Sequence, residues 1–106
     1  MVFRLGPWII DPSARQVSQR TDAIHPLPKA MAVLDVLVGA RGAVASRSEL
    51  LEKVWPHVTT GEEVLTQAVA GLRRALGDKP QTPRFLETVH RAGYRLLLLP
   101  SGPSAR

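Results

Sequence analysis

The chain has 106 residues and a formal net charge of +5, a length typical of one small domain. It contains no cysteine, which excludes disulfides, thiolate nucleophiles and cysteine-ligated metal centres. No apolar run approaches the roughly 20 residues that a membrane-spanning helix needs. Gly6-Pro7 also interrupts the N-terminus before the apolar segment of a signal peptide could form. The composition therefore predicts a soluble, basic domain of the cytoplasm.

The net charge is unevenly distributed along the chain. Residues 1–63 carry equal numbers of basic and acidic side chains, so the whole positive excess lies in residues 64–106. A basic surface attracts polyanions because each phosphate that it neutralises releases condensed counterions. A solvated basic surface can equally serve only to keep a small domain in solution. Charge alone therefore does not identify a partner.

Short β-strands are expected in the first 27 residues. Segments of β-prone residues alternate there with turn residues such as Gly6-Pro7 and Asp11-Pro12. The predicted strands cover residues 3–5, 8–10, 16–18 and 23–25.

Two helices are predicted in the following segment. From Ala30 to Leu37 apolar residues recur at helical spacing, after Pro28 and before a glycine-containing end at 39–42. The sequence Ser46-Arg-Ser-Glu49 forms a capping box, in which the serine hydroxyl bonds the glutamate amide and the glutamate returns to the serine amide. It predicts a second helix that Pro56 ends.

A third helix is predicted from a second capping box at 60–63 to Leu76, with Gly77 in a left-handed cap. At 100° per residue its largest aliphatic side chains form one narrow stripe. The opposite face carries small, hydrogen-bonding and charged side chains. The stripe contains Leu65, Val69, Leu72 and Leu76, and the opposite face contains Glu63, Thr66, Gln67, Ala70, Arg73 and Arg74.

The polar face of this helix has the chemistry that the major groove of DNA requires. Glutamine pairs with adenine through two hydrogen bonds, arginine pairs with guanine or phosphate, and alanine or threonine contacts the methyl group of thymine. An ordinary amphipathic surface helix has the same division of faces. The helix by itself therefore leaves both readings open.

A β-hairpin is predicted near the C-terminus. The β-prone segments 85–89 and 94–98 flank His90-Arg-Ala-Gly93, which supplies a basic tip. A helix pair followed by a basic hairpin is the arrangement of a winged helix, in which one helix enters the major groove and the hairpin contacts backbone or minor groove. Residues 100–106 have the composition of a linker.

In three segments, 46–56, 65–78 and 86–96, the sequence resembles the OmpR/PhoB-type winged-helix DNA-binding domains. The resemblance implies an α+β fold: a four-stranded antiparallel N-terminal sheet, three helices and a C-terminal hairpin wing, all within residues 1–99. The chain is most similar to the ToxR/CadC-like branch, where this domain comes first. In that case only a missing C-terminal segment would connect it to a membrane.

The resemblance also implies a partner and a set of contact residues. The partner is double-stranded DNA, bound by a pair of domains on repeated half-sites, and in relatives the loop matching 56–61 can touch RNA polymerase. Ser46 also serves as the helix cap, and Trp55 has core packing as its alternative role. The expected base-reading residues are Thr66, Gln67, Ala70 and Arg73, and the expected phosphate contacts are Ser46, Arg47, Trp55, Arg74, Thr88, His90, Arg91 and Arg95.

The sequence also bears on two other classes of function. An enzyme is disfavoured, since the three histidines (25, 57 and 90) lie in separate segments without metal-ligand spacing. No catalytic site, metal or cofactor is therefore expected. The serious alternative is a winged helix that contacts protein, or one that a missing domain must dimerise before it binds DNA. The small residues Ala70 and Gly71 motivate it, since they allow close approach of another surface.

Overall fold

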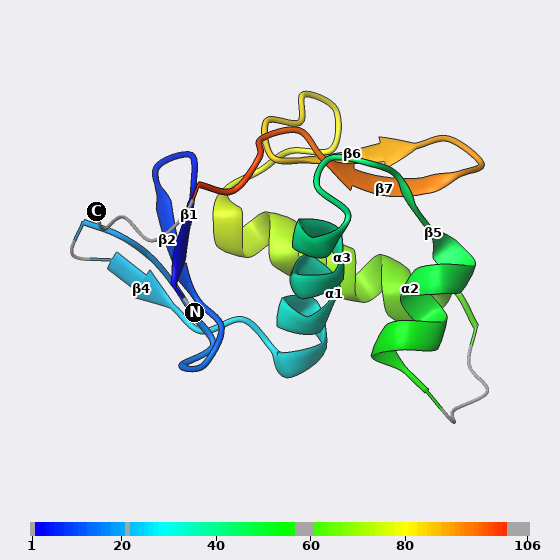
Figure 1. The fold of residues 1–106 in the computed structure, drawn as a ribbon, viewed down its shortest axis with the longest axis horizontal. Coiled ribbons are helices and arrows are strands. Elements are labelled where there is room, and N and C mark those ends of the chain that lie inside the picture. The colour runs from blue at the N-terminus through cyan, green and yellow to red at the C-terminus, as the bar shows by residue number, and fades with distance from the viewer. Residues whose placement is uncertain (1, 21, 57–60, 102–106) are drawn as a thin grey trace.

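The architecture is taken from a computed structural model, which describes residues 2–20, 22–56 and 61–101. Three helices lie between an N-terminal sheet and a C-terminal hairpin that passes over the helices (Figure 1). No helix in the described part of the chain is long and apolar enough to cross a bilayer.

The N-terminal sheet is an antiparallel meander in which neighbouring strands in sequence also pair in space. Its strands are β1 (Phe3–Leu5), β2 (Trp8–Asp11), β3 (Gln16–Gln19) and β4 (Asp22–Ile24). In β1, β2 and β3 alternate residues point to the core, as the period of a strand requires, whereas all three residues of β4 are exposed. The bounds of the four strands confirm the four predicted strands to within one residue at each end. The buried side chains of the sheet are Phe3, Leu5, Ile10 and Val17.

The helices are α1 (Pro28–Gly39), α2 (Arg47–Val54) and α3 (Glu63–Leu76). The apolar stripe predicted for the third helix is buried: each of its four side chains is at most 2% exposed. These side chains belong to one hydrophobic core with those of α1, α2 and both sheets. Gly77 ends α3 in the left-handed conformation, with φ of 66°, which glycine adopts without a Cβ clash.

The predicted caps are partly confirmed. The Ser46 hydroxyl accepts a hydrogen bond of 3.0 Å from the amide of Glu49, as the capping box requires. The Glu49 carboxylate, however, accepts from Lys53 at 3.0 Å rather than returning to the cap. α3 begins at Glu63 with Glu62 in the cap position and no side-chain cap bond. Thr60, the predicted cap, lies outside the described residues.

A second sheet joins the hairpin to the start of α2. It has the order β5 (Ala45–Ser46), β7 (Gly93–Leu96), β6 (Leu86–Val89). The hairpin was predicted but β5 was not. A Cβ at Gly93 would collide with the carbonyl oxygen of Ala45, so this close approach of β5 and β7 requires glycine.

Both sheets are attached to the C-terminal end of α3. On one side, the Trp8 indole Nε1 donates to the carbonyl oxygen of Leu76 at 3.1 Å. On the other side, the buried carboxylate of Asp78 accepts from three backbone amides at the start of the hairpin. These are the amides of Arg84 at 2.7 Å, Phe85 at 3.3 Å and Leu86 at 3.0 Å. The C-terminal end of α3, with Asp78 just after it, is therefore the junction of the two sheets.

The chain returns to the first sheet after the hairpin. Ser101 forms an antiparallel bridge with Arg4, with N–H···O distances of 3.1 and 3.0 Å. The structure therefore holds Ser101 against β1, although the sequence assigned this residue to a linker. Residues 102–106 lie outside the described residues.

Replacing Asp78 with alanine should lower the free energy of unfolding by about 3 kcal/mol, because buried amides lose a charged acceptor. Urea denaturation of the Asp78→Ala variant measures this change. Asp35→Ala is the matched control, since this exposed carboxylate on α1 should shift stability by no more than about 0.5 kcal/mol. Equal effects of the two substitutions would contradict a special role for Asp78.

Candidate nucleic-acid interface

The outward face of α3 combines polar, charged and small side chains. Glu63, Gln67 and Arg74 are exposed and Ala70 is half-buried, and their spacing places them along one side of the helix. In the part of the chain that the structure describes, no carboxylate pairs with Arg74. Besides Glu63, this face therefore offers one amide side chain and, among the described residues, one cation without a carboxylate partner, beside a small residue.

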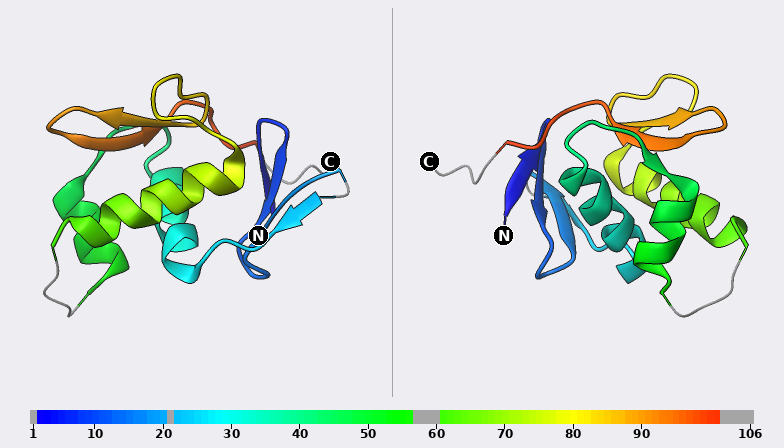
Figure 2. Two further views of the ribbon diagram at one scale, coloured as in Figure 1. Left: turned by 180° about the vertical axis from the view of Figure 1, so that it is seen from behind. Right: turned by 45° about the vertical axis from the view of Figure 1, so that its right-hand side comes forward.

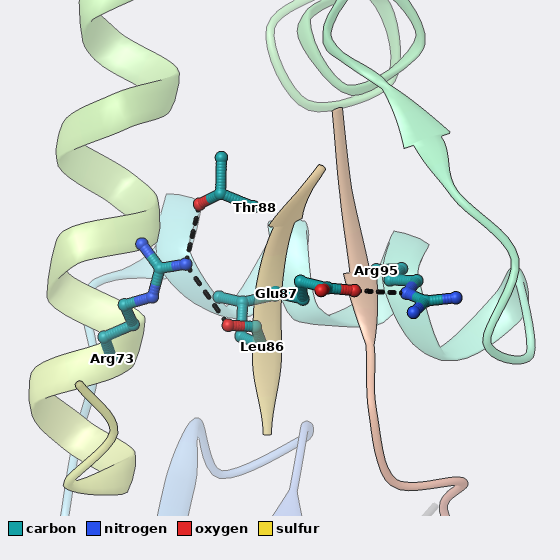
Figure 3. Close-up of polar contacts among 5 residues, drawn as sticks. All are labelled: Arg73, Leu86, Glu87, Thr88 and Arg95. Carbon is teal, nitrogen blue, oxygen red and sulfur yellow. Dashed lines mark hydrogen bonds and ion pairs between the residues drawn. The ribbon is translucent and has the colours of Figure 1, made fainter. Parts of the chain in front are cut away.

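The side chains of the two other predicted base-reading residues form hydrogen bonds within the protein. The Thr66 hydroxyl donates to the carbonyl oxygen of Glu62 at 3.2 Å, within the helix itself. The Arg73 guanidinium is half-buried and bonds the hairpin instead of pointing outward: one terminal nitrogen donates to Leu86 O at 3.2 Å and to Thr88 Oγ1 at 2.8 Å. Figure 3 shows this contact between α3 and β6.

The hairpin, residues 86–96, is called the wing from here on. Its tip exposes His90 and Arg91, and Arg91 has a positive φ of 63°, a conformation that costs a non-glycine residue about 1 kcal/mol. Arg95 donates through Nε to the Glu87 carboxylate on the neighbouring strand at 2.5 Å (Figure 3). The wing therefore presents Arg91 as its unpaired arginine among the described residues, while the charge of Arg95 is partly neutralised.

The N-terminus of α2 lies against the wing. Ser46 pairs with Gly93 in the second sheet, and the Arg47 guanidinium lies 6.0 Å from the centroid of the Tyr94 ring. Arg47 also approaches Glu62 at the start of α3, with an N–O distance of 3.7 Å. These contacts bring two predicted phosphate-binding residues, Ser46 and Arg47, to the same end of the molecule as the wing.

Trp55 lies on the other side of α3 from the wing. It lines a hollow of about 480 Å³ together with Gln67, Gly71 and Arg74 of α3 and with Lys29 of α1. Lys29 donates to the carbonyl oxygen of Val54 at 2.8 Å, and its ammonium lies 5.8 Å from the centroid of the Trp55 ring. The sequence did not indicate Lys29, because no spacing pattern connects it to the end of α2.

Three elements thus surround the outward face of α3. Viewed from behind, α3 lies in front of α1 and the wing runs along one side of it (Figure 2, left). The N-terminus of α2 joins the wing through β5, and Trp55 with Lys29 flanks the opposite side. A helix with exposed polar groups, bordered by a basic hairpin and a helix N-terminus, suits a surface that takes a phosphate-lined groove.

Comparison with known proteins identifies the family. A family model described as "Transcriptional regulatory protein, C terminal" matches residues 21–96. The chain belongs to this family. The match and the fold confirm the predicted resemblance to OmpR/PhoB-type domains and the predicted winged-helix architecture.

Named relatives of this family are transcriptional regulators. The chain is 32% identical over 98 residues to the transcriptional activator CadC of Escherichia coli, which covers 92% of this chain and 19% of CadC. It is 39% identical over 88 residues to the transcriptional regulatory protein CutR of Streptomyces coelicolor, covering 82% of this chain and 39% of CutR. The chain therefore spans well under half the length of these relatives.

Two solved DNA-binding domains share the fold of this OmpR/PhoB-type domain. The DNA-binding domain of E. coli CadC superimposes with a TM-score of 0.82 at 30% identity, covering 93% of this chain and 94% of that one. The DNA-binding domain of Klebsiella pneumoniae RstA, solved in complex with the RstA box, gives 0.76 at 26% identity, covering 90% and 95%. These likenesses and the family match support sequence-specific DNA binding.

The capping role of Ser46 is separable from any contact with phosphate. Ser46→Ala should lower the free energy of unfolding by about 1 kcal/mol, whereas Ser46→Asp should preserve it, because aspartate caps helices as well as serine. Thermal and urea unfolding of the two variants measure the difference. Equal destabilisation by both would show that the serine hydroxyl has a requirement beyond capping.

Proposed function

We propose that this domain binds a specific sequence of double-stranded DNA as the effector domain of a bacterial transcriptional regulator. The outward face of α3 enters the major groove, and the wing and the N-terminus of α2 contact the DNA backbone beside it. The observation that carries the proposal is an α3 face that exposes Gln67 and Arg74 next to a wing that is bonded both to α3 and to the N-terminus of α2.

The proposed contacts with DNA follow from which side chains are exposed or lack a partner within the described residues. Gln67, Ala70 and Thr66 face the base edges, since glutamine can pair with adenine and a methyl group can pack on thymine. Arg74 and Arg91 bind phosphates, because no carboxylate pairs with either among the described residues. The remaining contacts with the DNA backbone are made by five residues: Ser46, Arg47, Trp55, His90 and Arg95.

Three finer features rest on the family resemblance. We infer that the domain binds in pairs on repeated half-sites, that loop 56–61 contacts RNA polymerase, and that the protein acts in the cytoplasm. Residues 57–60 of that loop lie outside the described residues. Binding in pairs can be tested by comparing the affinity of the domain for duplexes that carry one half-site and two half-sites.

Arg74→Ala should weaken DNA binding by about 1–3 kcal/mol and make the salt dependence shallower by about one unit of slope, because one phosphate contact is lost. For the unaltered domain, four to six neutralised phosphates correspond to a slope of about −4 to −5 in log K against log salt. Titration of a duplex at several salt concentrations measures both quantities. Arg15→Ala, in the turn between β2 and β3, is the charge-matched control.

A slope near zero for the unaltered domain would contradict DNA binding by this surface. It would instead favour the protein-contact alternative, because an interface without phosphates releases no condensed counterions. Tethering two copies through a dimerisation module and repeating the titration tests whether binding requires a pair of domains.

Arg91→Gly should separate the stability of the domain from its affinity for DNA. Glycine relieves the positive φ of Arg91 and should stabilise the fold by about 0.5–1 kcal/mol, while the loss of the guanidinium weakens binding to all sequences about equally. Arg15 also has a positive φ, 48°, so Arg15→Gly should stabilise the fold without weakening binding. Altered base preference of Arg91→Gly would contradict a backbone contact.

A further inference from the structure

The side chain of Arg73 lies between α3 and the wing. It is half-buried, and one terminal nitrogen donates to two groups of β6: the carbonyl oxygen of Leu86 at 3.2 Å and the hydroxyl oxygen of Thr88 at 2.8 Å. Figure 3 shows the guanidinium reaching from the helix to the strand. The contact therefore links two elements that would touch DNA at different places.

The Nε atom of Arg73 is buried and has no hydrogen-bond partner among the described residues. A buried donor without a partner carries a desolvation cost. The side chain is thus held inward at some expense, by one terminal nitrogen whose two N–H groups serve two acceptors on β6. Arg74, the next residue along the helix, is exposed. The two consecutive arginines therefore occupy different environments.

We propose that Arg73 is a positioning residue, which sets the distance and angle between α3 and the wing, rather than a side chain that reads bases. The proposal rests on the proposed function in one respect: it assumes that α3 and the wing both contact DNA. Arg73 then strengthens DNA binding indirectly, because it holds the wing in place. Thr88 accepts a hydrogen bond from Arg73 rather than contacting a phosphate.

The physical effect of such a link is preorganisation. A wing held at a fixed position adds its phosphate contact to that of α3 with little further loss of conformational entropy. When the link is cut, the wing samples other positions and its contact contributes less. A base-reading arginine would behave differently, because its contribution would not depend on the wing.

A double-mutant cycle between Arg73 and Arg91 distinguishes the two roles. Arg73→Ala should weaken DNA binding roughly tenfold. Arg91→Ala should then weaken it by less than about twofold in the Arg73→Ala background, although it has its full effect in the unaltered domain. Arg74→Ala is the matched control: its effect should combine with that of Arg91→Ala independently, to within about twofold.

A second measurement tests the link without DNA. Amide hydrogen exchange of the free domain should become faster in the wing of Arg73→Ala, while the amides of α1 keep their rates, since only a local contact is lost. Arg74→Ala should change neither. Thr88→Val, which keeps the shape but removes the hydroxyl acceptor, should act in the same direction as Arg73→Ala with a smaller amplitude, and it keeps the test valid if Arg73→Ala fails to fold.

Independent effects of Arg73→Ala and Arg91→Ala on DNA binding, with loss of preference at one base pair and unchanged exchange in the wing, would overturn the proposal and make Arg73 a base-reading residue. Failure of the proposed function has another signature, since the unaltered domain would then show no salt-dependent binding. The exchange measurement would still report whether Arg73 holds the wing.

Discussion

The geometry of the domain depends on how the last turn of α3 and Asp78, just beyond it, hold Leu86, the first residue of the wing. The Asp78 carboxylate accepts from the Leu86 amide at 3.0 Å, and the Arg73 guanidinium donates to the Leu86 carbonyl oxygen at 3.2 Å. Both backbone groups of one residue are thus bonded to side chains from a single helix end. Because Leu86 is also fully buried, the start of the wing has little freedom to move relative to α3.

The same helix end also positions the N-terminal sheet. The Trp8 indole bonds the Leu76 carbonyl oxygen, one of the groups that a helix C-terminus leaves without an intrahelical partner. The first sheet therefore contacts the C-terminal end of α3, while Gln67 and Ala70, two of the side chains proposed to contact DNA, lie in earlier turns. The sheet can support the helix without covering its outward face.

Local sequence patterns predicted much of this structure. The buried stripe of α3, the Ser46 cap, the left-handed Gly77 and the hairpin all depend on residues within a few positions of one another. β5 was missed because two residues carry no periodic signal, and its pairing with β7 joins segments far apart in the chain. The inward orientation of Arg73 was missed for a related reason, since helical spacing assigns a side chain to a face but does not reveal which neighbour it bonds.

Not every basic side chain that contributes to the net charge is available to contact DNA, because some of them bond other groups of the protein. The positive excess lies wholly in residues 64–106, yet Arg73 bonds the wing and Arg95 bonds Glu87. The long-range attraction of DNA depends on total charge, so it is retained. On the proposed function, contact with individual phosphates depends instead on Arg74 and Arg91, which have no carboxylate partner among the described residues. On the proposed function, preference for a DNA sequence then rests mainly on Gln67 and on the close approach to the bases that Ala70 permits. The fit of α3 in the major groove therefore contributes more to this preference, and hydrogen bonds from arginine to bases contribute less, than the two arginines on α3 would suggest.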